Sequence, residues 1–328
     1  MTKSHKRLLF IAKRALYGIP VILGIVIVNF LLLQLMEGDA VDALAGEAAS
    51  ATPEYMAQLR ERFGLDQPIY VQLFAYVRNV VMLDLGYSFR HDMPVLDLIM
   101  TRLGPTMLLM TTTLFIAIVM GIVLGLLAAT GLNTWRDTII SILALVSYAT
   151  PLFWVGLMLV LLFSVRLGWL PTSGMETIGA GYTGLERALD IARHMVMPVI
   201  ALSLFYMAAF TRLMRASMLE QANMDYVTTA RAKGLTERRI VWGHVLRNAV
   251  LPVVTMGGVQ IANMLGGSVI IESVFGWPGL GLLAFEALFA RDLNLLLGIF
   301  LLAACMVVVA NLVIDIIYTF LDPRIELK

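Results

Sequence analysis

The sequence predicts an all-α membrane protein in which six transmembrane helices cross the bilayer and both termini lie in the cytosol. Three observations support this fold class. Of the 328 residues, 59% are hydrophobic and 14% are charged, whereas soluble domains contain about 45–50% apolar and about 25% charged residues. The mean hydropathy is +0.85. The apolar residues also gather in six runs that are each long enough to cross a bilayer.

A spanning helix needs about 20 residues at a rise of 1.5 Å per residue, and lipid offers no partners for backbone groups outside a helix. The first run has 22 residues and follows a basic N-terminus. It exceeds the 7–15 residues of a signal-peptide core, so we interpret it as a retained span. The six predicted spans are Ala15–Met36, Pro105–Thr130, Ile139–Val165, Met195–Arg215, Val250–Phe275 and Leu293–Phe320.

Lysine and arginine residues set the predicted orientation. With both termini inside, the cytosolic segments hold 15 of these residues and the external loops hold eight. This bias follows the positive-inside rule. The chain therefore divides into a cytosolic tail 1–14, a first transmembrane helix 15–36, an external loop 37–104, a five-helix core 105–320 with a cytosolic loop 216–249, and a cytosolic tail 321–328.

Composition excludes several function classes. The net charge of +1 argues against a nucleic-acid partner. The single cysteine, Cys305, allows neither a disulfide framework nor a cysteine-based metal site, and the four histidines have no ligand spacing. The chain lacks the Gly-Lys-Ser/Thr ending of a nucleotide-binding loop. We therefore expect no catalytic residue, no bound metal and no ATP hydrolysis by this chain.

The external loop 37–104 is predicted to contain short helices. Thr52-Pro53-Glu54 is typical of a helix start, and the helix would run over Glu54–Phe63. A second amphipathic helix is predicted over Pro68–Leu83, followed by a turn at Asp84–Ser88. These helices would cap the outer face of the bundle, and the same cap could serve as a docking surface for an external partner.

Polar residues in the fifth span are candidates for a translocation path, because polar groups in lipid are costly. Met256, Gln260, Asn263 and Gly267 follow at intervals of four, three and four residues and would share one helix face. The stripe could line a water-filled route or make hydrogen bonds between helices beside a glycine contact. Glu272, near the outer end, would be a gate residue or would reach the interface.

The cytosolic stretch 225–235 is the most informative segment. Small residues favour a short helix with basic residues near its end, and Gly234 suits the left-handed position that stops a helix. Thr236 would cap a second helix over Glu237–Asn248. Basic residues alone would also suit anionic lipid, but the small side chains favour close approach of a protein surface. The candidate coupling residues are Asp225, Tyr226, Thr228, Thr229, Ala230, Arg231, Ala232, Lys233, Gly234 and Leu235.

The stretch Thr228–Leu235 resembles the cytosolic EAA loop of ABC-importer permeases, and Asp225–Leu235 is similar to its peptide/nickel branch. Further motifs in the same order extend the resemblance over nearly the whole chain. They are Asp84–Ser88, Leu170–Gly174, Glu272–Gly281 and Leu321–Arg324. Thr228, Thr229 and Ala230 stand where the general pattern has Glu-Ala-Ala, and Leu246-Arg247 stands where it has Leu-Pro.

The resemblance implies a type I ABC importer permease, the first of two in a dipeptide or oligopeptide import system of a bacterial inner membrane. It implies a second related permease as heterodimer partner, two cytosolic ATPase subunits that bind ATP and Mg²⁺, and an external substrate-binding protein. Nickel, glutathione and opine importers are alternatives within the class. A secondary carrier would need a charge relay or inverted repeats, and a membrane scaffold would not need the 225–235 segment.

Overall fold

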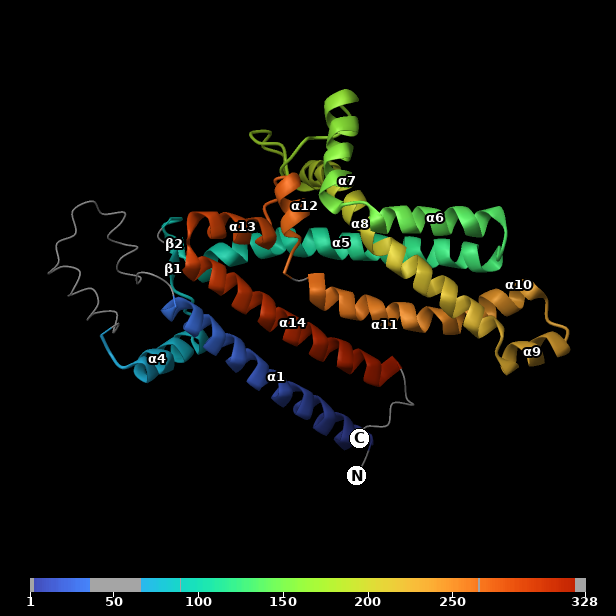
Figure 1. Ribbon diagram of the computed structural model, residues 1–328, viewed down its shortest axis with the longest axis horizontal. Helices are drawn as coiled ribbons and strands as arrows, with labels where there is room; N and C mark the ends of the chain where they lie inside the picture. Colours follow the sequence, from blue (N-terminus) through green and yellow to red (C-terminus); the bar gives the residue numbers. More distant parts are fainter. Residues whose placement is uncertain (1–2, 36–65, 89, 265, 322–328) are drawn as a thin grey trace. The chain divides into compact units, whose positions relative to one another are not determined.

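The computed structural model describes residues 3–35, 66–88, 90–264 and 266–321, and most of these residues are helical (Figure 1). Within these ranges, five helices are long and apolar enough to cross a membrane, and they become six when a bent pair of helices is taken as one span. The predicted all-α membrane fold is confirmed. The chain divides into one unit made of residues 1–102 and 283–328 and another made of residues 103–282.

The first unit is built on two long helices, α1 (Lys3–Gln34) and α14 (Leu293–Leu321), which pack against each other. Gly18 permits their close approach, because a Cβ there would lie 2.7 Å from Cγ1 of Val308. The Asn29 amide donates to the carbonyl of Leu297 across the pair at 3.2 Å. Small residues and polar side chains at such contacts are typical of helix association in membranes.

The part of the external loop that the structure describes belongs to this unit. The predicted helix Pro68–Leu83 is observed as α4 (Ile69–Val81), which contacts α1 through Phe30 and Tyr76, with ring centroids 5.8 Å apart. The predicted turn continues into two short strands, β1 (Tyr87–Ser88) and β2 (Met93–Pro94), paired antiparallel. The Ser88 hydroxyl donates to the Asp292 carboxylate next to α14. The predicted helix Glu54–Phe63 lies outside the described residues.

The second unit holds the remaining helices. They are α5 (Val95–Thr130), which begins in the first unit, α6 (Trp135–Ala149), α7 (Leu152–Leu159), the π-helix η1 (Val160–Arg166), α8 (Gly184–Ala222), α9 (Asp225–Ala232), α10 (Glu237–Ile240), the π-helix η2 (Val241–Val245), α11 (Leu246–Met264), α12 (Val269–Val274) and α13 (Leu280–Ala290), which ends in the first unit.

Helix α8 is the centre of the second unit and contacts α6, α7, α11 and α12. It also packs on α5 at two glycines four residues apart, Gly121 and Gly125. A Cβ on Gly125 would lie 2.8 Å from the carbonyl oxygen of Thr211, and one on Gly121 would meet the Phe210 side chain. Glycines at this spacing let two helix backbones approach closely, so α5 and α8 form a tightly packed pair.

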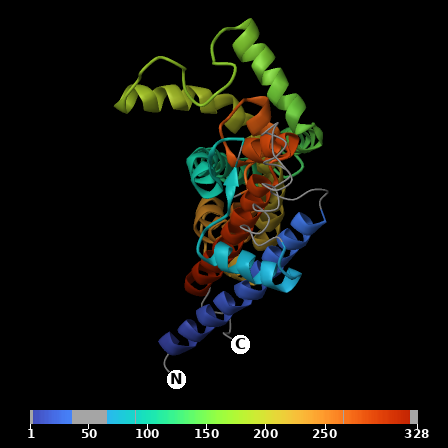
Figure 2. The same cartoon turned by 90° about the vertical axis from the view of Figure 1, so that its left-hand side faces the viewer.

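The third span is broken, contrary to the straight helix predicted over Ile139–Val165. Helices α6 and α7 meet at an angle of 100°. Pro151 has no N–H to continue the helix, and it moves the residue before it towards extended backbone. Thr150 accordingly has φ −78° and ψ 131°. Figure 2 shows α7 with η1 in green and the first half of α8 in yellow-green projecting from the other helices of this unit.

The fifth span also differs from the prediction Val250–Phe275. The helix begins much earlier, at Glu237, and runs through α10, η2 and α11 to Met264. Gly267 follows with φ +80°, a left-handed conformation that ends the helix. The last part of the predicted span is a separate six-residue helix, α12. A run of apolar residues predicts that a segment lies in the bilayer, but it does not show whether the segment is one continuous helix.

Candidate functional site

Helix α9 has one buried face and one exposed face, and the predicted coupling residues divide between them. Val227 and Ala230 are 0% and 5% exposed and belong to the apolar core of the second unit. Tyr226 and Leu235 are half-buried. The exposed face consists of residues three and four positions apart, which align on one side of a helix, namely Asp225, Thr228, Thr229 and Ala232. This face is free of bulky side chains.

The end of α9 confirms the predicted glycine stop. Gly234 has φ +77°. Its N–H donates to the carbonyl of Arg231 at 2.9 Å, and the N–H of Leu235 donates to the carbonyl of Ala230 at 3.3 Å. These two bonds are the pair that closes a helix in a Schellman motif, and the half-buried Leu235 supplies the accompanying apolar contact. The reversal therefore has a fixed geometry.

Figure 1 shows α9 between α8 and α10 along the chain, and side chains tie it to both helices. The Tyr226 hydroxyl donates to the Gln221 side chain on α8 at 2.8 Å. The Arg231 guanidinium donates to both Glu237 carboxylate oxygens on α10, at 2.7 and 3.3 Å. This hydrogen-bonded carboxylate raises the pKa of Arg231. Both partners are exposed, so the pair fixes the geometry of the reversal more than it stabilises the fold.

A fork between α6 and α8 lies about two turns before the end of α8, and sequence reasoning missed it. Arg215 donates through Nε and Nη2 to the two oxygens of Asp137, at 2.7 and 2.8 Å. Asp137 is 5% exposed. Bidentate arginine–carboxylate pairs fix orientation as well as distance. The two residues are 78 positions apart, so spacing gives no signal, although a charged pair near two span ends would have justified a search.

The predicted stripe of span five is only partly on one helix. Met256 and Gln260 are half-buried on α11, and Met256 packs against the apolar core. Asn263 lies on α11, but its side chain is outside the described residues. Gly267 lies beyond the end of α11 and does not share its face, so the predicted four-residue stripe is wrong at this position.

Glu272 does not reach the interface, contrary to one of the two expectations, whereas its role as a gate residue stays a prediction. It is 0% exposed. Its carboxylate accepts hydrogen bonds from the Thr106 hydroxyl at 3.2 Å, from the N–H of Ser268 at 3.3 Å and from the N–H of Leu282 at 2.9 Å. Three donors around one buried carboxylate satisfy it internally, so Glu272 joins α12 to α5 and α13.

Glycines make room for this carboxylate. A Cβ on Gly267 would lie 2.7 Å from Oε1 of Glu272, one on Gly281 would lie 2.9 Å from Oε2, and one on Gly279 would collide with the carboxyl group. The buried Trp277 indole donates to the carbonyl of Pro105 at 3.0 Å. The motif Glu272–Gly281 is thus a packed junction that fixes the chain path between α11 and α13.

Comparison with known proteins identifies the family. Residues 121–327 match the family model described as the binding-protein-dependent transport system inner membrane component, and residues 7–111 match the corresponding N-terminal model. The chain belongs to this family. It is accordingly a multi-pass permease subunit of a bacterial inner membrane, and the transport family, rather than an enzyme family, accounts for nearly its full length.

Relatives of this inner membrane component resemble it from end to end. A putative peptide permease protein of Brucella ovis is 42% identical over 95% of this chain and 97% of its own. The oligopeptide transport system permease protein AppB of Bacillus subtilis is 39% identical over 97% and 99%. The dipeptide transport system permease protein DppB of Alkalihalophilus pseudofirmus is 35% identical over 97% and 99%.

Two solved structures show the same fold. The MetNI methionine ABC transporter in inward-facing conformations aligns with a TM-score of 0.53 and 16% identity, covering 69% of this chain and 96% of that one. An amino acid ABC transporter crystallised with histidines aligns with a TM-score of 0.51 and 18% identity, covering 69% and 94%. The predicted type I ABC importer permease fold is confirmed.

Proposed function

We propose that this permease carries dipeptides or oligopeptides into the cytosol as one of two related permeases in an ATP-driven importer. The observation that carries the proposal is the end-to-end similarity, at 35–42% identity, to relatives named as peptide, oligopeptide and dipeptide permeases. A second permease would complete the translocation path, two cytosolic ATPase subunits would bind ATP and Mg²⁺, and an external binding protein would deliver the peptide.

The exposed face of α9 is the proposed contact with an ATPase subunit. Small side chains at Thr228, Thr229 and Ala232 let a protein groove approach the helix backbone, and Asp225 and Lys233 offer charges at its two ends. Because α9 is tied to both α8 and α10, movement of the ATPase would be passed to the fourth and fifth spans together. The coupling is a two-state equilibrium of the bundle that ATP binding biases.

The test of function is reconstitution. The two permeases, both ATPases and the binding protein are placed in liposomes, and ATP-dependent uptake of labelled dipeptides and oligopeptides is measured beside nickel, glutathione and an opine. We expect uptake of peptides only, and only with the complete set of subunits. Uptake of one of the other substrates in place of peptides would refute the peptide assignment, and uptake by this chain alone would indicate a secondary carrier.

A further inference from the structure

The break between α6 and α7 places unpaired backbone in the middle of a span. Helix α6 ends with carbonyls that have no intrahelical donor, α7 begins with free N–H groups, and Pro151 supplies no N–H. The hydroxyl and the N–H of Thr150 both donate hydrogen bonds to the carbonyl of Val146, at 2.7 and 3.0 Å. Non-helical backbone at membrane depth is tolerated where it is buried in protein or lines a wet cavity.

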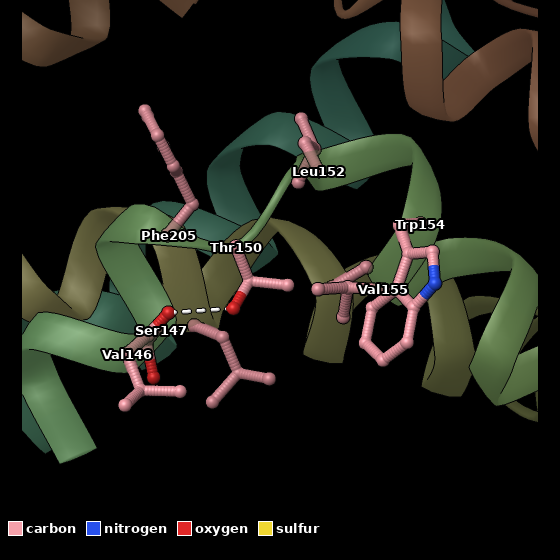
Figure 3. A pocket seen from close by; sticks show the side chains of 9 residues that line it. Val146, Ser147, Thr150, Leu152, Trp154, Val155 and Phe205 are labelled. Carbon is pink, nitrogen blue, oxygen red and sulfur yellow. Dashed lines mark hydrogen bonds between the residues drawn. The ribbon is translucent and has the colours of Figure 1, made fainter.

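A pocket of about 190 Å³ lies at this break. Figure 3 shows its lining on both sides of the break, with Val146 and Ser147 from α6, Thr150 at the break, Leu152, Trp154 and Val155 from α7, and Phe205 from α8. The walls are mostly apolar, and Ser147 and Thr150 add two hydroxyls. A protein cavity of about 150 Å³ holds a benzene ring. The pocket therefore fits one aliphatic or aromatic side chain.

An arginine without a carboxylate partner lies beside this pocket. The guanidinium carbon of Arg212 on α8 is 4.7 Å from the ring centroid of Tyr148, and that ring stacks on Phe205 of the pocket wall at 5.6 Å. Among the described residues, Arg212 makes no ion pair, whereas Arg215 on the same helix is paired with Asp137. A cation resting on an aromatic ring retains its capacity to bind an anion.

The spacing of the two features matches a peptide. The distance from the Arg212 guanidinium to the Tyr148 ring and the distance from that ring to the Phe205 ring together place the guanidinium within roughly 10 Å of Phe205. This is about the length of three extended residues. A peptide carries a carboxylate at one end and side chains along an extended backbone. A lipid headgroup is anionic too, and the experiments below separate it from a peptide by comparing peptide acids with amides and by varying the lipid.

We propose that Arg212 and the pocket at the α6–α7 break form a binding subsite for the C-terminal end of a transported peptide. The carboxylate binds the Arg212 guanidinium, and an apolar side chain within the last three residues enters the pocket. Backbone N–H and carbonyl groups at the break face the intervening peptide bonds. The inference rests on the proposed peptide function, and it adds a preference that belongs to the permease rather than to the binding protein.

The first experiment measures uptake by the complete reconstituted importer. Tripeptides with a free C-terminus are compared with their C-terminal amides in the parent protein, Arg212→Gln and Arg212→Lys. Because the binding protein is identical in all samples, its own preference cancels in the comparison. We expect Arg212→Gln to lower the acid-to-amide uptake ratio about ten-fold or more, and Arg212→Lys to retain part of it. Arg136→Gln is the matched control, since Arg136 also rests on an aromatic ring, at 5.6 Å from Trp135.

The second experiment tests the pocket and does not depend on the amides. In a Cys305→Ser background, Thr150→Cys is used to trap tripeptides that carry a cysteine at each position in turn, with a mild added oxidant that accepts the two electrons of disulfide formation. We expect a disulfide with one position, lost when Arg212→Gln is added, and none with Thr138→Cys on α6. Ser147→Leu should lower uptake of tripeptides with phenylalanine at that position relative to alanine.

The outcomes separate the two proposals. The subsite is overturned if the parent protein takes up peptides but Arg212→Gln leaves the acid-to-amide uptake ratio unchanged. It is also overturned if Thr150→Cys traps no peptide. Either result leaves the proposed function intact. If Arg212→Gln lowers uptake of peptide acids and amides equally, and only in liposomes of anionic lipid, Arg212 binds a lipid headgroup instead of the peptide. No peptide uptake by the parent protein refutes the proposed function itself.

Discussion

Replacing Gly234 should uncouple transport from ATP hydrolysis without unfolding the permease. Gly234 ends α9 at φ +77°, and no atom lies within 4 Å of a Cβ built there. Any penalty therefore comes from backbone conformation and not from a clash. A left-handed conformation costs an L-residue about 1–2 kcal/mol, and a β-branched side chain raises this towards about 3 kcal/mol. A cost of about 1–2 kcal/mol lowers the ratio of the native reversal to its alternatives by a factor of about 5–30.

The substitutions Gly234→Asn, Gly234→Ala and Gly234→Val form a graded series, because asparagine tolerates the left-handed region best and valine least. The assay is ATP hydrolysis stimulated by loaded binding protein, measured with peptide uptake in the reconstituted importer. We expect activity to fall in the order asparagine, alanine, valine, with unchanged membrane yield. Gly243→Ala is the control, because Gly243 has equal space and no positive φ. Full coupling in Gly234→Val, or equal loss in all three variants, would refute the reasoning.

Three further predictions concern the packed junctions of the second unit. Glu272→Leu leaves three donors around the lost carboxylate, each costing about 1–3 kcal/mol when buried and unpaired. The thermal unfolding temperature in detergent should therefore fall more than for Glu286→Leu, and equal temperatures would contradict a stabilising role of Glu272 in the junction. Asp137→Asn and Arg215→Gln should each lower stability, and their double-mutant cycle should give a coupling energy of about 0.5–3 kcal/mol, whereas strict additivity would mean that the fork contributes nothing. Gly125→Leu should abolish stable expression through overpacking against α8, which is measured by size-exclusion chromatography. Gly104→Leu on the same helix should be tolerated, because a Cβ at Gly104 meets no atom within 4 Å.

The spans and the helical reversal at Gly234 were predictable because they depend on local features. Apolar run length fixes which segments cross a bilayer, and a glycine after a small-residue helix needs only its own backbone freedom to end that helix. The spacing of Gly121 and Gly125 was equally readable as a close helix contact. Pro151 within an apolar run also indicates the break in the third span, and the prediction of a straight helix over Ile139–Val165 did not use it.

The remaining features depend on contacts between distant segments. Glu272 was expected at the interface because an isolated carboxylate avoids lipid. Its actual burial follows from donors on Thr106 and Leu282 that only the folded chain brings to it. The same holds for Asp137 and Arg215. The end of α11 at Met264 was likewise missed, because the apolar sequence continues beyond it.

The π-helix η2 between α10 and α11 has a consequence for changes in chain length. A π-turn holds one residue more than an α-turn, because its hydrogen bonds reach one residue further along the chain. Removing a single residue within Val241–Val245 would convert η2 into ordinary α-helix while leaving the buried faces of α10 and α11, including Ile240 and Ala249, in phase with the core. The same deletion inside α11 would rotate everything beyond it by about 100°. This segment is therefore the place in the fifth span where the chain can lose a residue and keep its packing.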